Sequence, residues 1–313
     1  MSRDETRLGP GPEFDAIREI MERLGDVASG LGDDAAVVDM PRGDRLVVST
    51  DASIENRHFK SAWLTPREIG YRAVTAALSD LAAMAAHPIA VLWAVNLPQR
   101  WRPMLPELTA GAGEAAQRVG AKVVGGNLAA TEELSIVTTV IGSTFRPLER
   151  KGANPGDKLY VTGSLGGPGL ALTAWMEGKT PAPAHRERFA RPAARLMEAR
   201  WLATHGATAG MDLSDGLAGD VRHLSAASAV SLTIHLDRLP RVDGASAFVA
   251  AWSGEEYELL VTAPSIDTVE FAARFGIPLT EIGEVGAGDA VAFLDKGRAA
   301  DVAGGHDHFR VSR

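Results

Sequence analysis

The sequence contains no cysteine among its 313 residues. This absence excludes disulfide bonds, cysteine nucleophiles and metal sites with thiolate ligands. An excess of basic residues is also absent, because the formal net charge is −8 at pH 7. DNA or RNA binding requires a positively charged face, so the sequence argues against a nucleic-acid partner.

Long apolar segments are missing as well. The most apolar stretch, residues 73–97, is interrupted by Asp80, His87 and Pro88, so we expect no membrane-spanning helix. The first residues lack the apolar run of a signal peptide, and the expected location is therefore cytoplasmic. The remaining composition, 45% hydrophobic and 23% charged, is that of an ordinary globular protein.

Periodicity and turn residues predict a mixed α/β (α+β) chain with two domains, 1–148 and 149–313. The boundary lies beside residues 150–157, where the apolar pattern breaks into Gly, Asn, Pro and Asp. Thr65-Pro-Arg-Glu68 is a capping box that predicts the start of a long helix. The predicted helices cover about 14–24, 65–86, 105–119 and 169–177; the predicted strands cover 35–38, 45–50, 89–97, 122–124, 134–142, 158–162 and 258–262; residues 178–192 are predicted to be a surface loop.

Several aspartates stand among small or apolar residues, where a solvated carboxylate is not expected. Asp80 falls inside the long predicted helix with no Lys or Arg one turn away, and a buried carboxylate must find a cation, a metal or a proton. An exposed polar helix face explains Asp80 equally well. Asp33 and Asp34 fit a turn, and Ser214 or Asp215 fits a helix N-cap, whereas Asp51 follows a strand where ligands commonly bind.

Two glycine-rich segments are weaker signals. Gly163-Ser-Leu-Gly-Gly-Pro-Gly169 follows a predicted strand and opens a predicted helix, an arrangement that can hold phosphate on backbone N–H groups. It lacks the Lys-Ser/Thr pair of a P-loop. Gly125-Gly126-Asn127 is interpreted as a close-approach turn after a strand.

Taken in order, these segments resemble the thiamine-monophosphate kinase family of the aminoimidazole-ribonucleotide-synthetase-like ATP-binding superfamily. The resemblance covers nearly the whole chain, and the order and spacing of its motifs make it specific. It is carried by Gly32-Asp-Asp-Ala-Ala36, Ser49-Thr-Asp51, His58-Phe59, Leu78-Ser-Asp-Leu-Ala-Ala-Met-Ala85, Gly125-Gly126, Lys151-Gly-Ala-Asn-Pro-Gly-Asp157, Met211-Asp-Leu-Ser-Asp-Gly-Leu217, Gly254-Glu-Glu-Tyr-Glu-Leu259 and Asp307-His-Phe309.

The resemblance implies an N-terminal domain that binds ATP and Mg²⁺ and forms a shared β-barrel with its copy in a homodimer. It implies a C-terminal domain, a sheet covered by helices, that completes the nucleotide and substrate cleft. The implied activity is ATP-dependent phosphorylation of thiamine monophosphate to thiamine diphosphate. ATP is then the co-substrate and Mg²⁺ the cofactor.

The resemblance also implies roles for single residues. Asp212 and Asp215 are the candidate catalytic residues. The implied metal ligands are Asp33, Ser49, Thr50, Asp51, Asp80, Asp212 and Asp215; the implied ATP contacts are Gly126, Asn127, Arg150 and Ser214; the implied substrate contacts are His58, Glu256 and His306.

The chain departs from the family pattern at a few of these positions. Asn127 replaces an aspartate that is normally a metal ligand, Glu256 replaces an aspartate, and His306 replaces an aromatic residue. A tyrosine usual beside the nucleotide corresponds to Thr109. The departures keep two alternatives open, a superfamily ATP enzyme with another small acceptor and a catalytically silent nucleotide-binding relative.

The implied chemistry agrees with the residue types. An acceptor phosphate is already ionised at neutral pH, since its second pKa is about 6, so direct in-line transfer needs no strong general base. Carboxylate oxygens are the ligands that Mg²⁺ prefers, and bound cations offset the repulsion between two phosphates.

Overall fold

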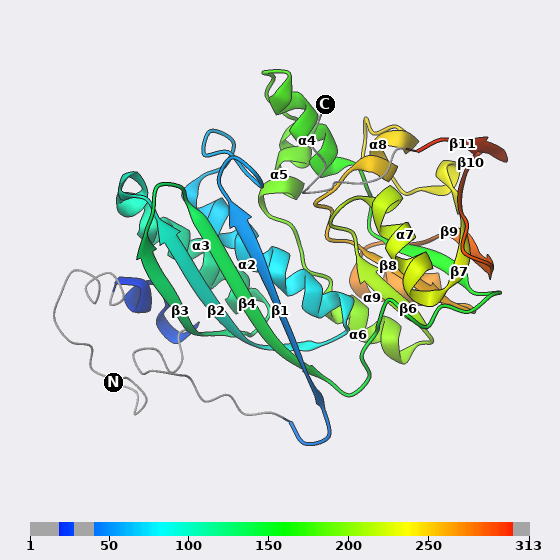
Figure 1. Ribbon diagram of the computed structural model, residues 1–313, viewed down its shortest axis with the longest axis horizontal. Helices are drawn as coiled ribbons and strands as arrows, with labels where there is room; N and C mark the ends of the chain where they lie inside the picture. The colour runs from blue at the N-terminus through cyan, green and yellow to red at the C-terminus, as the bar shows by residue number, and fades with distance from the viewer. Residues whose placement is uncertain (1–18, 28–40, 303–313) are drawn as a thin grey trace. The chain divides into compact units, whose positions relative to one another are not determined.

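The computed structural model describes residues 19–27 and 41–302 and has two compact units, Met1–Leu81 with Ala86–Phe145, and Ala82–Ala85 with Arg146–Arg313. Both units combine a sheet with helices, so the predicted mixed α/β class is confirmed (Figure 1). The chain's described helices include none that is both long and apolar enough to cross a membrane.

The N-terminal unit is built on a four-stranded sheet in the order β1-β4-β2-β3. Strand β4 pairs antiparallel with β1 and β2, whereas β2 and β3 are parallel and are joined through α3. Among the described residues of one chain, this sheet is open and forms no closed barrel. Its elements are η1 Gly25–Val27, β1 Arg45–Ile54, α2 Pro66–Ala83, β2 His87–Leu97, η2 Gln99–Met104, α3 Leu105–Arg118, β3 Lys122–Ala130 and β4 Ser135–Thr144.

Helices α2 and α3 lie on the same face of this sheet (Figure 1) and touch through their backbones. A Cβ atom added at Gly70 would lie 1.9 Å from the carbonyl oxygen of Leu108, and one at Gly111 would lie 1.8 Å from that of Arg67. Only glycine permits this approach. The close packing fixes α2, which carries Asp80, against the unit.

The predicted start of α2 is confirmed. The Glu68 carboxylate accepts from the Thr65 backbone N–H at 2.8 Å, and the Thr65 hydroxyl accepts from the Glu68 N–H at 3.3 Å, which is the reciprocal pair of a capping box. The predicted end at residue 86 is late. Ala85 adopts φ 52°, and the N–H groups of Ala85 and Ala86 bond back to Ala82 and Leu81, a Schellman motif that ends the helix before Pro88.

The C-terminal unit contains a seven-stranded sheet in the order β11-β10-β7-β9-β5-β8-β6. Strand β8 is buried along its whole length, and the core lies between the sheet and helices α7 and α8 (Figure 1). The elements of this unit are β5 Lys158–Thr162, α4 Gly167–Met176, α5 Pro183–Ala190, α6 Leu196–Thr204, β6 Ala209–Asp212, α7 Leu217–Ser228, β7 Val230–His235, η3 Leu236–Arg238, α8 Ala247–Trp252, β8 Leu259–Ala263, α9 Thr268–Phe275, β9 Leu279–Ala287, β10 Val291–Asp295 and β11 Arg298–Ala300.

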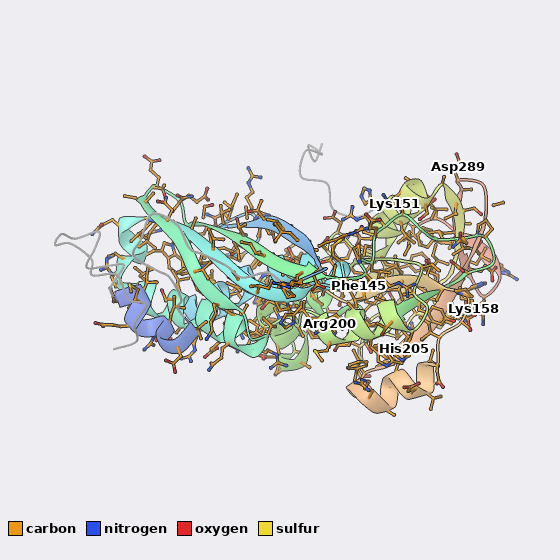
Figure 2. All side chains as sticks on the ribbon, turned by 90° about the horizontal axis from the view of Figure 1, so that it is seen from below. Phe145, Lys151, Lys158, Arg200, His205 and Asp289 are labelled. Carbon is orange, nitrogen blue, oxygen red and sulfur yellow. The ribbon has the colours of Figure 1, made fainter. Side chains whose placement is uncertain are left out.

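The surface loop predicted over residues 178–192 is wrong, because α5 lies within it. Pro183 is compatible with the first turn of a helix, and the buried Phe189 packs edge-on against Trp175 of α4 at 5.3 Å. Tertiary packing therefore holds a helix in a segment whose prolines and charges indicated a loop. A similar aromatic contact ends α6, where the ring of His205 (labelled in Figure 2) stacks on Trp201 at 3.8 Å.

Candidate active site

In the N-terminal unit, the structure brings two candidate metal ligands together. Ser49 lies on β1, and its hydroxyl donates to the Asp80 carboxylate at 2.5 Å. Asp80 lies in the last turn of α2 and is partly exposed. It is therefore a paired, half-buried carboxylate and not a solvated residue on a free helix face. Asp51 shares the face of Ser49 because side chains alternate along a strand, and its carboxylate accepts from the N–H of Ala52 at 2.7 Å.

Thr50 points to the opposite face of β1. Its hydroxyl lies 3.0 Å from that of Thr139 on β4, its register partner. Strand alternation thus separates the Thr50 side chain from those of Ser49 and Asp51.

The turn predicted at Gly125-Gly126-Asn127 is wrong, because these residues lie inside β3 and pair with β2. A Cβ at Gly126 would lie 2.0 Å from the carbonyl oxygen of Trp93. The close approach of β2 therefore requires glycine at position 126. Asn127, the next residue, is exposed on the opposite face of the sheet. Thr109 is fully buried in α3.

His58 follows β1 in a loop that is held in place by a buried carboxylate. Glu55 accepts from Arg100 at 2.6 Å and from the Trp101 indole at 3.1 Å. The Ile54 N–H donates to Nδ1 of His58 at 3.1 Å. A neutral ring with an acceptor Nδ1 carries its proton on Nε2.

In the C-terminal unit, the Asp212-Leu-Ser-Asp215 loop joins β6 to α7. Asp212 ends β6 and is 4% exposed, while Ser214 is exposed and Asp215 is partly exposed. The N-cap interpretation of Ser214 and Asp215 is wrong, because Gly216 is the cap residue, with φ 101°, and no side chain caps α7. The loop therefore leaves these two side chains available for other contacts.

Asp220 is a candidate that sequence reasoning missed. It is 1% exposed on the first turns of α7, and one carboxylate oxygen, Oδ2, has no hydrogen-bond partner. Burial, together with the charges of Asp212 and Asp215, raises the pKa of Asp220 to about 8, against the opposing effects of Arg150 and the Gly216 backbone. The sequence did contain an indication of this. Asp220 falls at the helical spacing of the apolar residues Leu217, Val221 and Leu224, and a carboxylate is rarely buried among such residues.

Arg150 is exposed, and its backbone is held by Ser228. The Ser228 hydroxyl donates to the Arg150 carbonyl at 2.7 Å and accepts from the N–H groups of Gly152 and Ala153 at 3.1 and 3.2 Å. The guanidinium is near enough to favour the charged form of Asp220. This placement suits a residue that meets phosphate charge beside the aspartates.

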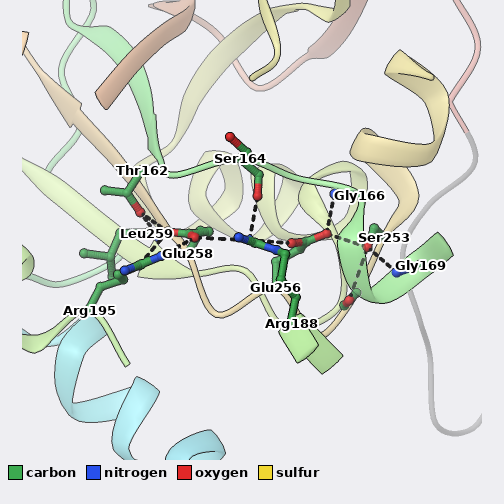
Figure 3. Close-up of polar contacts among 11 residues, drawn as sticks. Thr162, Ser164, Gly166, Gly169, Arg188, Arg195, Ser253, Glu256, Glu258 and Leu259 are labelled. Carbon is green, nitrogen blue, oxygen red and sulfur yellow. Dashed lines mark hydrogen bonds and ion pairs between the residues drawn. The ribbon is translucent and has the colours of Figure 1, made fainter. Parts of the chain in front are cut away.

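Glu256 is buried, with a side chain 1% exposed. Its Oε1 accepts from the Gly166 N–H and from the Ser253 hydroxyl, each at 2.5 Å, and Arg188 lies 3.3 Å from Oε2 (Figure 3). Burial raises the pKa of Glu256 to about 7, although Arg188 and these two donors oppose the shift.

These contacts contradict the interpretation of Gly163–Gly169 as a phosphate cradle. The Gly166 N–H is bound to Glu256, and the Gly169 N–H donates to Ser253 at 2.9 Å. The N-terminal turn of α4 thus receives an internal carboxylate where a bound anion would otherwise sit. Asp33 and His306 lie outside the described residues.

The candidate ligands are aspartate carboxylates and a serine hydroxyl, and these suit Mg²⁺, which prefers hard oxygen ligands. The best indication is Asp220, whose buried Oδ2 lacks a partner beside the negative charges of Asp212 and Asp215. Within residues 19–27 and 41–302, no three histidine, aspartate or glutamate side chains converge as a ready-made metal site.

Comparison with known proteins gives a consistent result. The family model "AIR synthase related protein, N-terminal domain" matches residues 32–144, and its C-terminal counterpart matches residues 154–296. The thiamine-monophosphate kinase of Salmonella typhimurium is 33% identical, and the match covers 95% of each chain.

Solved structures agree with the sequence matches. The thiamine-monophosphate kinase of Stenotrophomonas maltophilia superposes with a TM-score of 0.81 at 30% identity, covering 94% of this chain and 98% of that one. A structure described as "AaThiL complexed with AMPPCP and TMP" gives a TM-score of 0.76 at 30% identity, covering 97% and 99% of the two chains. The chain belongs to the thiamine-monophosphate kinase family and carries both AIR synthase-related domains.

Proposed function

We propose that this chain transfers the γ-phosphoryl group of ATP to thiamine monophosphate and releases thiamine diphosphate and ADP. The observation that carries the proposal is its likeness, along nearly the full length of both chains, to a protein solved with AMPPCP and TMP together. AMPPCP is an ATP analogue, so that complex holds a stand-in for the donor together with TMP.

The proposed reaction is a direct in-line displacement. An oxygen of the acceptor phosphate attacks the γ-phosphorus, and the bond from that phosphorus to the ADP oxygen breaks. The acceptor phosphate is ionised at neutral pH, so no residue has to remove its proton. The protein's task is to position two anions and to balance their charge.

The residues suited to hold Mg²⁺ are Asp80 and Asp51 with Ser49 in the N-terminal unit, and Asp212 and Asp215 in the C-terminal unit. Mg²⁺ bound there supplies positive charge that offsets the phosphate charges and stabilises the charge of the transition state. Arg150 and the exposed Ser214 suit contacts to the nucleotide phosphates, and His58, in the loop after β1, is the proposed substrate contact.

The alternative of another small acceptor rested partly on Glu256. That side chain binds the chain's own Gly166 and Ser253, so its difference from the family residue concerns internal packing. The alternative of a silent relative rested on Asn127, which is exposed on the sheet face opposite to Gly126. The Glu256 contacts therefore remove one argument for another acceptor, and the turnover assay tests the silent relative.

A turnover assay tests the proposal. Purified protein with ATP, Mg²⁺ and thiamine monophosphate is expected to form thiamine diphosphate, followed by chromatography. EDTA is expected to stop product formation, and excess Mg²⁺ to restore it. ADP formation without thiamine diphosphate would move the assignment to another acceptor, while Mg·ATP binding without any turnover would identify a silent relative.

We further propose that the chain forms a homodimer through the open face of the four-stranded sheet. No described helix covers this face (Figure 1), and two of its β1 residues, Leu46 and Val48, are 58% and 54% exposed. The β4 partner of Val48 is Ile141, so the apolar surface continues across strands. A second copy would bury this surface and complete a shared barrel.

Light scattering coupled to size exclusion measures this association. The wild-type chain is expected to elute with twice the monomer mass, and Val48→Lys with the monomer mass. Val269→Lys is the matched control because Val269, on α9, is also an exposed apolar residue. A monomeric wild type, or a dimeric Val48→Lys, would refute the proposed face.

A further inference from the structure

Segment 253–258 joins two loops of the C-terminal unit. On one side, the N–H groups of Glu255 and Tyr257 donate to the carbonyls of Ser214 and Leu213 at 2.7 and 2.9 Å. The Leu213 N–H in turn donates to the Glu258 carbonyl at 2.8 Å. The backbone between the two candidate metal ligands Asp212 and Asp215 is therefore held by this segment.

The same segment has an unfavourable backbone conformation. Glu255 and Tyr257 have φ angles of 62° and 54°, in the left-handed region that is unfavourable for non-glycine residues. Such a conformation persists only where surrounding contacts determine it, and it occurs often at functional sites. Glu256 lies between these two residues.

Glu256 supplies the contacts that hold the segment on its other side. Its carboxylate binds the Gly166 N–H directly and reaches the Gly169 N–H through Ser253 (Figure 3). Arg188 also binds the Ser164 carbonyl at 2.6 Å and lies near both Glu256 and Glu258. The Gly163–Gly169 turn thus serves as an anchor for the segment.

Glu258 fixes the end of the segment through partners outside that turn. Arg195 donates to its two carboxylate oxygens at 2.8 and 2.6 Å, and the Thr162 hydroxyl donates at 2.8 Å. Glu258 is 1% exposed. These donors compensate the charge of Glu258. Of the two glutamates, it is therefore Glu256 that connects the Gly163–Gly169 turn to Glu255 and Tyr257.

We propose that Glu256 is a positioning residue of the phosphoryl-transfer site: it pins segment 253–258 to the Gly163–Gly169 turn, and the segment sets the geometry of the Asp212–Asp215 loop. The inference rests on the proposed function of Asp212 and Asp215 as Mg²⁺ ligands. It replaces the expectation that Glu256 contacts the substrate.

Three variants and a matched control test the proposal. Glu256→Ala removes the anchor, Ser253→Ala weakens it, and Glu256→Gln keeps an acceptor oxygen for Gly166 and Ser253. Val285→Ala is the control, because it removes buried side-chain volume from β9, a strand of the same unit that lies outside segment 253–258.

The kinetic readouts are kcat and the Mg²⁺ concentration for half-maximal activity. Glu256→Ala is expected to lower kcat and to raise that concentration, each by about 10–100-fold, as for loss of a residue that orients a metal ligand. Ser253→Ala is expected to change both in the same direction but less. Glu256→Gln is expected to restore both to within about threefold, and Val285→Ala to leave both near wild type.

Hydrogen exchange gives a readout independent of activity. The amides of Glu255 and Tyr257 are expected to lose protection in Glu256→Ala but to keep it in Val285→Ala at equal global stability. Unchanged protection, or kinetics that match those of Val285→Ala, would overturn the proposal. A rise in the thiamine monophosphate KM alone would also overturn it, because that result indicates a substrate contact.

Hydrogen exchange and the Mg²⁺ dependence can test the role of Glu256 even if the proposed function is wrong. If the wild-type chain forms no thiamine diphosphate, the proposed acceptor is wrong. Glu256→Ala can still be tested then by calorimetric titration of Mg·ATP in place of turnover. Weaker Mg·ATP binding with exposed Glu255 and Tyr257 amides would support the positioning role, and unchanged binding would refute it. If Glu256→Ala does not fold, Ser253→Ala and Glu256→Gln decide the question by the same measurements.

Discussion

Asp80→Ala is expected to lower kcat by about 10³-fold or more while leaving thermal stability nearly unchanged. The physical reason is that a charged metal ligand contributes several kcal/mol to stabilisation of the transition state, and each 1.36 kcal/mol is a factor of ten in rate. The hydrogen bond from Ser49 that the variant loses is partly exposed, and such a bond is worth about 1 kcal/mol. Steady-state kinetics and thermal denaturation of the same preparation measure the two effects.

Asp44→Asn provides a matched control in the same unit. The Asp44 carboxylate also accepts from a serine hydroxyl, that of Ser143 at 2.8 Å, and is also partly exposed. It has no proposed role in binding, so its kcat is expected to stay within about twofold of wild type. If Asp80→Ala instead retained full activity, the assignment of this residue to the metal site would be wrong.

Local signals in the sequence predicted local structure well. Thr65 and Glu68 lie three residues apart, so the capping box could be recognised from spacing alone. The central strands β2 and β8 also follow from apolar runs. Strand β1 was predicted to end at residue 50, but it continues to Ile54, so Asp51 lies within the strand and not after it. The end of α2 was predicted late, because Ala85 takes the left-handed conformation that usually calls for glycine.

Structure that depends on contacts between residues far apart in the sequence could not be predicted from local signals. Glu256 stands in a run of charged residues that resembles a surface, yet it is buried because Arg188, 68 positions earlier in the chain, lies beside it. Likewise α5 is held by the packing of Phe189 against Trp175. Such contacts become visible only when the fold brings the segments together.

Within the candidate site, the residue types indicated which side chains could bind a metal, but the sequence did not show which of these side chains contact one another. The pairing of Ser49 with Asp80 could not be predicted from segments 31 positions apart. Side chains alternate along β1, so the Thr50 side chain lies on the face opposite to its neighbours. Gly126 is required by the close approach of strand β2. Asp220, by contrast, could have been found, because its spacing from Leu217 and Leu224 already placed a carboxylate on a core-facing helix surface.

Asp220→Asn is expected to stabilise the metal-free protein at pH 8. Burial, with the nearby charges of Asp212 and Asp215, raises the pKa of Asp220 from 3.8 to about 8. Between these values the folded protein holds a proton that the unfolded chain has released, so the free energy of unfolding falls as pH rises through this window and levels off above it. Because one pKa unit corresponds to about 1.4 kcal/mol, the loss across the window is on the order of 5 kcal/mol.

Asparagine keeps the size of the side chain but carries no charge, so Asp220→Asn should remove this part of the pH dependence. Urea unfolding in EDTA at pH 5, 6.5 and 8 measures it. The wild type is expected to weaken steadily across the series relative to the variant, with the largest gap at pH 8. Asp267→Asn is the control, since Asp267 is an exposed carboxylate that caps α9 and asparagine caps a helix equally well. Parallel curves for wild type and Asp220→Asn would mean that Asp220 is already ionised at pH 5, and that Arg150 and the Gly216 backbone outweigh the repulsion from Asp212 and Asp215.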